Sequence, residues 1–159
     1  GTNPHKNLIR TIEALKEFPC KLCIVGKLHE DQIYMLQKHK IDYENVYNLT
    51  EQEVLEKYIN CDIVSFVSLH EGFGMPIIEG QSIGRPILTS NITPMKEIAS
   101  NGGAILVNPW DVKSIRDGYQ EALTHSDDLI KKGLENVKRF RLDIITSQYY
   151  NVYKQLMKA

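Results

Sequence analysis

The segment SLHEGFGMPIIEG, Ser68 to Gly80, joins two kinds of local structure. The apolar run DIVSFVS that leads into it is typical of a buried strand, and the following MPIIEGQSIG is typical of a helix. HEGFG is therefore a turn from strand to helix, with Pro76 in the first helical turn, where its missing N–H costs nothing. Gly72 and Gly74 allow left-handed backbone dihedrals and let a ligand approach the backbone closely. The segment predicts a strand–turn–helix unit whose turn can face a ligand.

Apolar segments and segments with helical periodicity alternate along the rest of the chain. The predicted strands are LCIVG, NVYNL, DIVSFVS, RPILTS and GAILVN. The expected helix N-caps between them are Asn7, Thr50 (with Glu53 in a capping box), Thr93 and Asp111. Near-continuous apolar strands separated by helices predict an α/β fold, a Rossmann-like parallel sheet with helices on both faces. The tail from Ser126 to Met157 predicts two further helices broken near FRLD.

Composition narrows the class of protein. The 159 residues are 42% hydrophobic and 25% charged, as expected for a single globular domain over 1–159. The net charge of -1 gives no basic field for nucleic acid, so no nucleic-acid partner is expected. No apolar run approaches the ~20 residues that span a bilayer. Together with an odd number of cysteines, which suits a reducing compartment, this predicts a cytoplasmic protein, or one peripheral at the inner face of the membrane.

The cysteines and histidines predict no cofactor chemistry. CKLC runs directly into the strand IVG, so Cys20 and Cys23 are expected to be buried strand residues and not a redox pair. The five histidines are scattered without a ligand spacing, and a structural zinc site needs about four converging ligands. The sequence predicts no metal site.

Two glutamates flank the turn and suggest its ligand. Glu71 falls at the strand tip, and Glu79 falls about one turn into the helix. The helix end offers free N–H groups and a positive dipole to a phosphate, and ionised carboxylates accept hydrogen bonds from sugar hydroxyls. Phosphate and hydroxyls together indicate a sugar nucleotide. The alternative is an ordinary surface turn, with Glu79 placed there only because the helix dipole favours it.

EGFGMPIIE resembles the E-x7-E signature of retaining glycosyltransferases of the GT-B fold, family 4 (glycosyl transferases group 1). The resemblance extends through GRPILTSNITPMKEIASNGGAILVNPWDVKSI, and KLCIVGK and GTNPHKN also fit it, so that it covers Gly1 to about Leu123. It implies the C-terminal, donor-binding half of a two-domain enzyme. The N-terminal acceptor domain and a first strand before Gly1 would then lie outside this chain, and the isolated fragment would be inactive.

The resemblance also implies residue roles. Glu79 would hold the ribose hydroxyls, and Glu71 would contact the donor sugar as a catalytic residue. Gly72 lies in the turn, and the backbone amides of Phe73, Gly74 and Met75 would meet the donor sugar or the diphosphate. Lys6 would neutralise charge on the departing diphosphate, since glycosyl transfer builds negative charge there. Weaker assignments are Leu49 near the base and Ser90 and Thr93 near the diphosphate or ribose, with Thr93 also explained as a helix cap.

One position departs from the family pattern. Thr2 stands where many members have an arginine, and a threonine hydroxyl cannot replace a bidentate guanidinium on phosphate. Lys6 and the helix end would then suffice, or His5 or Lys27 would substitute. No D-x-D pair is present, and Asp127 and Asp128 are explained as capping charges, so metal-independent transfer is expected.

The predicted activity is transfer of a sugar from a UDP, GDP or ADP donor to a hydroxyl of a glycan or lipid-linked acceptor. By analogy, the setting would be synthesis of cell-envelope polysaccharide, such as capsule or lipopolysaccharide. Two alternatives stay open. One is a non-catalytic module that binds nucleotide sugars, because binding and catalysis use the same residues. The other is a dinucleotide-binding oxidoreductase domain, although no G-x-G-x-x-G fingerprint is present.

Overall fold

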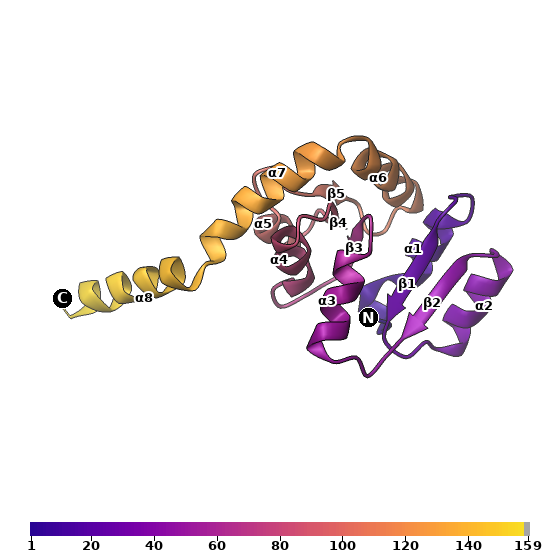
Figure 1. The fold of residues 1–159 in the computed structure, drawn as a ribbon, viewed down its shortest axis with the longest axis horizontal. Helices are drawn as coiled ribbons and strands as arrows, with labels where there is room; N and C mark the ends of the chain where they lie inside the picture. Colours follow the sequence, from indigo (N-terminus) through magenta and orange to yellow (C-terminus); the bar gives the residue numbers. More distant parts are fainter. Residues whose placement is uncertain (158–159) are drawn as a thin grey trace.

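The computed structural model describes residues 1–157 as an α/β domain with a projecting C-terminal helix (Figure 1). The strands are β1 Lys21–Val25, β2 Asp42–Val46, β3 Val64–Phe66, β4 Ile87–Ser90 and β5 Ile105–Val107. The helices are α1 Leu8–Leu15, α2 Glu30–Lys38, α3 Glu51–Ile59, α4 Met75–Ser82, α5 Met95–Ile98, α6 Val112–Thr124, α7 Ser126–Asn136 and α8 Leu142–Leu156, with short 3-10 helices η1 Pro4–Lys6 and η2 Val137–Phe140. Each predicted strand overlaps one observed strand, which confirms the α/β class, although β2 begins three residues before the predicted strand NVYNL.

All strands pair in parallel, but they form two sheets and not one. β1 pairs with β2, and β3, β4 and β5 pair in that order. Within the described residues, β1 and β3 therefore each have one edge without a strand partner. The predicted parallel arrangement is confirmed, and the strands are divided into two sheets because no described strand joins β1 to β3.

Helices cover both faces of the three-stranded sheet, as predicted. One apolar cluster packs α1 and α6 against it, with Leu15, Leu88 and Ile115 buried at its centre. A second cluster packs α4 and α5 on the strands, around Ile77 and Ile87. These two layers fix the position of α4, whose N-terminal end carries the predicted turn.

The two-stranded sheet has one buried face. Ile24 of β1 packs with α1 and α2 in a third apolar cluster, whereas the alternate residues Lys21, Cys23 and Val25 are exposed. The prediction of buried cysteines is therefore wrong: Cys23 is exposed, and Cys20 is half-buried just before the strand. A strand covered on one face exposes every second side chain, whatever its polarity.

Most helix starts agree with the sequence. Thr50 and Glu53 form the predicted capping box of α3, and the Asp111 carboxylate accepts from the Lys113 N–H at the start of α6. Asn7 is the N-cap of α1, but its side chain donates to the Pro109 carbonyl, 2.6 Å away, and makes no cap bond. The Thr93 cap is wrong by one residue, because α5 begins at Met95 with Pro94 as its N-cap.

The tail forms the two predicted helices, α7 and α8, with η2 between them. Asp127 and Asp128 lie in the first turn of α7, where carboxylates favour the dipole. α8 points away from the body of the domain (Figure 1), and none of its residues is buried. Its apolar side chains are exposed, including Leu142, Tyr149 and Leu156.

Candidate functional site

The predicted site residues come from two segments that meet beyond the carboxyl end of β3. The Leu69 N–H donates to the His5 carbonyl at 2.7 Å, and the rings of His5 and His70 lie 4.8 Å apart between centroids. These contacts attach the loop before α1 to the loop after β3. Ligands of parallel α/β sheets bind at this edge.

Lys6 and Glu71 form an ion pair at this junction. The Lys6 Nζ lies 2.6 Å from the Glu71 Oε1, and their side chains are only 24% and 14% exposed. The same ammonium lies 5.0 Å from the centroid of the Phe66 ring, in cation–π geometry. The two residues that the resemblance assigned to catalysis are therefore brought into direct contact, and their opposite charges offset each other.

The surroundings of Glu71 favour its ionised form. Burial alone would raise the pKa of Glu71, but the hydrogen bond from Lys6, the nearby Ser68 hydroxyl and the charges of Lys6 and His5 outweigh it and lower that pKa. Ser68 is 1% exposed, and its Oγ has no hydrogen bond of ordinary geometry within the described residues. Glu71 is thus an acceptor-only carboxylate at neutral pH.

The turn is built as predicted at Gly74 but not at Gly72. Gly74 is the N-cap of α4 with φ +116°, a backbone conformation that residues other than glycine rarely adopt. Gly72 has no positive φ, so its predicted left-handed backbone is wrong. A Cβ built on Gly72 would meet nothing within 4 Å, so this glycine leaves open space beside the turn.

The amides of the turn are available to a ligand. Among the described residues, no backbone carbonyl accepts from the N–H groups of Phe73, Gly74 or Met75. Pro76 follows in the first turn of α4 and has no N–H. The helix end therefore presents unpaired donors and the positive end of its dipole at one place.

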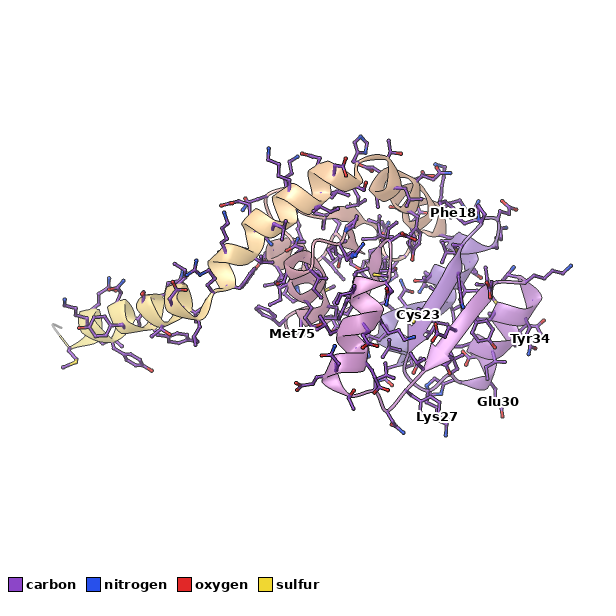
Figure 2. The ribbon with its side chains drawn as sticks, in the orientation of Figure 1. Phe18, Cys23, Lys27, Glu30, Tyr34 and Met75 are labelled. Carbon is purple, nitrogen blue, oxygen red and sulfur yellow. The ribbon has the colours of Figure 1, made fainter. Side chains whose placement is uncertain are left out.

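The two large side chains of the turn, Phe73 and Met75, are exposed. Phe73 meets Phe140 of η2 edge to face, with ring centroids 5.9 Å apart. Met75, labelled in Figure 2, opens α4 and is 51% exposed. The turn is thus supported from the C-terminal side by η2.

Glu79 has a hydrogen-bond partner that the sequence analysis did not predict. The Tyr58 hydroxyl of α3 donates to the Glu79 Oε2 at 2.7 Å. Burial raises the pKa of Tyr58 well above its ordinary value, and the hydrogen bond to Glu79 and the charge of that carboxylate raise it further. Tyr58 lies far from Glu79 in the sequence, and only the packing of α3 beside α4 brings them together.

The hydroxyls of three weaker assignments donate to other groups of the protein. The Thr2 side chain is 8% exposed and donates to the Lys27 carbonyl at 2.7 Å, so its hydroxyl is not free for phosphate. Ser90 is fully buried, and its Oγ donates to the Ser68 carbonyl at 2.6 Å, so it stabilises the loop that follows β3. Thr93 is exposed and donates to Glu97 at 2.9 Å.

The remaining assignments lie at the same edge of the sheets. Leu49 is half-buried in the loop that follows β2, as predicted, next to the Thr50 cap of α3. Lys27 is exposed in the loop after β1 (Figure 2), and His5 is half-buried beside His70.

The described residues contain neither a cluster of metal-ligating side chains nor a membrane-spanning helix. No group of three or more His, Cys, Asp or Glu side chains in residues 1–157 could hold a metal ion. In the same part of the chain, no helix has both the length and the apolar character needed to cross a membrane.

Fold and site together define a class: a parallel α/β domain with a helix N-terminus and two flanking carboxylates at the carboxyl edge of its strands. Comparison with known proteins gives the family. The model of the family "Glycosyl transferases group 1" matches residues 2–139, and the chain belongs to this family. This agrees with the resemblance carried by the E-x7-E segment and disfavours the oxidoreductase alternative.

Similar proteins share this domain within longer chains. The serotype-specific mannosyltransferase WbdA of Escherichia coli is 31% identical over 136 residues, which cover 76% of this chain and 16% of the relative. Sucrose-phosphate synthase from Thermosynechococcus elongatus has the same fold, with a TM-score of 0.83, 20% identity, and coverage of 98% of this chain and 43% of that one. Anabaena HepE, solved with UDP and glucose, gives a TM-score of 0.81 at 16% identity, covering 99% of this chain and 46% of that one. The chain thus spans less than half the length of each.

Proposed function

We propose that this chain is the donor-binding domain of a retaining, metal-independent glycosyltransferase. The full protein would move a sugar from a nucleoside-diphosphate sugar to a hydroxyl of a glycan or lipid-linked acceptor, in the synthesis of cell-envelope polysaccharide such as capsule or lipopolysaccharide. The observation that carries this proposal is the arrangement at one helix tip. The α4 turn carries amides that no described backbone carbonyl accepts from, and along the chain it lies between Glu71, which pairs with Lys6, and Glu79.

Each group would have one role. Glu79 accepts hydrogen bonds from the ribose hydroxyls, and Glu71 accepts from a hydroxyl of the donor sugar. The amides of Phe73, Gly74 and Met75 bind the diphosphate or donor sugar, together with the positive end of the helix dipole. Lys6, which pairs with Glu71, stabilises the diphosphate as the bond from the anomeric carbon to the phosphate oxygen breaks.

The free ion pair implies an exchange of partners when the donor binds. With no ligand, Lys6 is neutralised by Glu71 at 2.6 Å. A bound diphosphate offers the ammonium a second and stronger anion, while a sugar hydroxyl offers Glu71 a new donor. Binding then replaces a charge–charge contact by two contacts to the substrate, so the pair does not block the site.

We also propose that a strand and an acceptor domain precede this domain in the full protein. β1 and β3 each have one edge without a strand partner among the described residues, and each belongs to a parallel sheet. The Leu22 side chain of β1 packs into the same apolar cluster as Leu88 of β4, so the two sheets lie close together. A strand between them would join the two sheets into the predicted one. The short coverage of the longer relatives, 16% for WbdA and 46% for HepE, supports a second domain.

The donor is a sugar linked to UDP, GDP or ADP, because the proposed contacts use only ribose, diphosphate and sugar hydroxyls. WbdA is named as a mannosyltransferase, so a mannosyl nucleotide is the first donor to test. A cytoplasmic location, or a peripheral one at the inner face of the membrane, would fit such a reaction.

Release of nucleoside diphosphate by the full-length protein tests the proposal. GDP-mannose and the UDP- and ADP-linked glucoses are each incubated with the protein, with and without cell-envelope lipid extract as a source of acceptor. We expect release from one donor, and a loss of at least tenfold in kcat for Lys6→Met and Glu71→Gln. The matched control is Asp117→Asn, which breaks the exposed Lys113–Asp117 pair on α6 and should leave the rate unchanged. Binding of a donor without any release would favour the non-catalytic module.

A further inference from the structure

The contact between Tyr58 and Glu79 links two helices across the proposed ribose site. Tyr58 lies in α3 and Glu79 in α4, and the donor–acceptor distance is 2.7 Å. Both side chains are half-buried. An ionised carboxylate only accepts hydrogen bonds, so the tyrosine hydroxyl is the donor.

The tyrosine ring is held independently of its hydroxyl. It packs against the apolar cluster beneath α4 that contains Val64, Ile77 and Ile87. The start of α3 is fixed by the capping box of Thr50 and Glu53. The hydroxyl therefore reaches Glu79 from a fixed support, and the ring would stay in place without it.

The hydrogen bond uses one oxygen of the carboxylate. Oε2 of Glu79 accepts a hydrogen bond from Tyr58. Among the described residues, Oε1 of Glu79 has no ion pair and no side-chain hydrogen bond. A glutamate side chain without such a tether samples several rotamers and loses that freedom when it binds a ligand. A tether present before binding lowers this cost.

We infer that Tyr58 is a positioning residue, which holds the Glu79 carboxylate in the orientation that accepts the ribose hydroxyls of the donor. This inference rests on the proposed function, because it assumes that Glu79 binds ribose. The tyrosine remains protonated at physiological pH, since burial and the hydrogen bond both raise its pKa. It acts on binding through Glu79 and does not itself touch the substrate.

Paired ligands test the inference in the full-length protein. The dissociation constants of UDP, GDP and ADP, each beside its 2′,3′-dideoxy analogue, are measured by calorimetry for the wild type and for Tyr58→Phe. Phenylalanine keeps the ring and removes the hydroxyl. We expect Tyr58→Phe to weaken the preferred ribonucleotide about tenfold and to leave its dideoxy analogue unchanged. In turnover, KM for the donor should rise while kcat stays nearly constant, because the lost contact is the same in ground and transition states.

Two controls separate a positioning role from a structural one. Tyr119→Phe removes another buried hydroxyl, which lies 2.5 Å from the Ser65 Oγ in the opposite apolar layer, and should change neither affinity. In a Glu79→Ala background, Tyr58→Phe should have no further effect on ribonucleotide affinity.

The outcomes distinguish the inference from the proposed function. If the wild type prefers the ribonucleotide but Tyr58→Phe binds it equally well, the positioning role is wrong and the proposed function stands. An equal loss for both ligands of a pair would mean a structural role, which also overturns the inference. If the wild type does not distinguish the two ligands, Glu79 does not bind ribose, and the proposed assignment fails together with the inference.

Discussion

Replacing Gly74 by alanine should destabilise the domain through the backbone of the α4 turn. Gly74 has φ +116° and ψ 44°, and an added Cβ would lie 3.1 Å from the Ile77 Cδ1. A residue with a side chain held in such a conformation costs about 1–3 kcal/mol, of which the lower entropy of the unfolded alanine chain returns about 0.4–1 kcal/mol. The isoleucine methyl can shift slightly, so its contribution is small. The net loss in free energy of unfolding is therefore about 1–2 kcal/mol.

Gly72→Ala is the matched comparison, because it changes the same turn without either effect. Gly72 has no positive φ, and its added Cβ would meet nothing within 4 Å. Its free energy of unfolding should stay within about 0.5 kcal/mol of the wild type. Its methyl group would occupy the open space beside the turn, so the affinity for nucleoside diphosphate should fall.

Urea unfolding at neutral pH and calorimetric titration with the preferred nucleoside diphosphate measure the two quantities. For Gly74→Ala, the midpoint of thermal unfolding should also fall by about 2–8 °C for a domain of this size. The reasoning fails if Gly74→Ala is as stable as the wild type. It also fails if Gly72→Ala folds normally and binds as tightly as the wild type, since the ligand would then not approach the turn.

Three further predictions concern the pairs and packing around the site. The lowered pKa of Glu71 means that the Lys6–Glu71 pair stabilises the fold above the unfolded carboxyl pKa of about 4.3 and is lost as pH falls through the lower folded value. The difference in unfolding free energy between wild type and Glu71→Gln should be about 1–2 kcal/mol at pH 7 and near zero at pH 2, and equal differences would contradict it. Gly80→Ala would place a Cβ 2.6 Å from the Ile87 Cδ1 and 2.8 Å from the Val64 Cγ2, and should lower stability by about 1–3 kcal/mol in urea unfolding, whereas a gain in stability would show that α4 can move away from the sheet. Phe140→Ala removes the edge contact to Phe73 and should speed hydrogen exchange of the turn amides and weaken nucleotide binding about two- to tenfold, and unchanged exchange would mean that η2 does not support the turn.

Local sequence rules predicted the part of the site that is continuous in the chain. The apolar run before Glu71, the two glycines and Pro76 defined the strand, the turn and the start of α4, all of which the structure contains. Thr50 with Glu53 identified a helix start for the same reason. These features depend on neighbouring residues only, and each has one dominant physical cause.

Other features depend on packing between distant segments and were missed. The exposure of Cys23 follows from the bare face of the two-stranded sheet, which the composition of one strand does not reveal. No helix was predicted over 30–38, because its start uses an unusual cap in which the His29 N–H donates to the Gln32 side chain. In the sequence, Tyr58 is one apolar position of a predicted helix. Only the approach of α3 to α4 in the structure shows that its hydroxyl bonds to Glu79.

The predicted conformation of Gly72 shows a different limit. Two glycines in one turn were given the same explanation, but only Gly74 needs a left-handed backbone. A glycine can be present for its dihedrals or for the space that its missing side chain leaves, and the sequence does not distinguish these causes. The structure does, through φ at Gly74 and the open space at Gly72.

A crystal structure of the full-length protein with its preferred nucleoside diphosphate would show directly whether the α4 turn binds the nucleotide. We expect ribose hydroxyls within hydrogen-bond distance of the Glu79 carboxylate, diphosphate oxygens on the amides of Phe73, Gly74 and Met75, and Lys6 turned from Glu71 toward the diphosphate. A nucleotide bound elsewhere, or bound here with the Lys6–Glu71 pair intact and Glu79 facing away from the ribose, would contradict it.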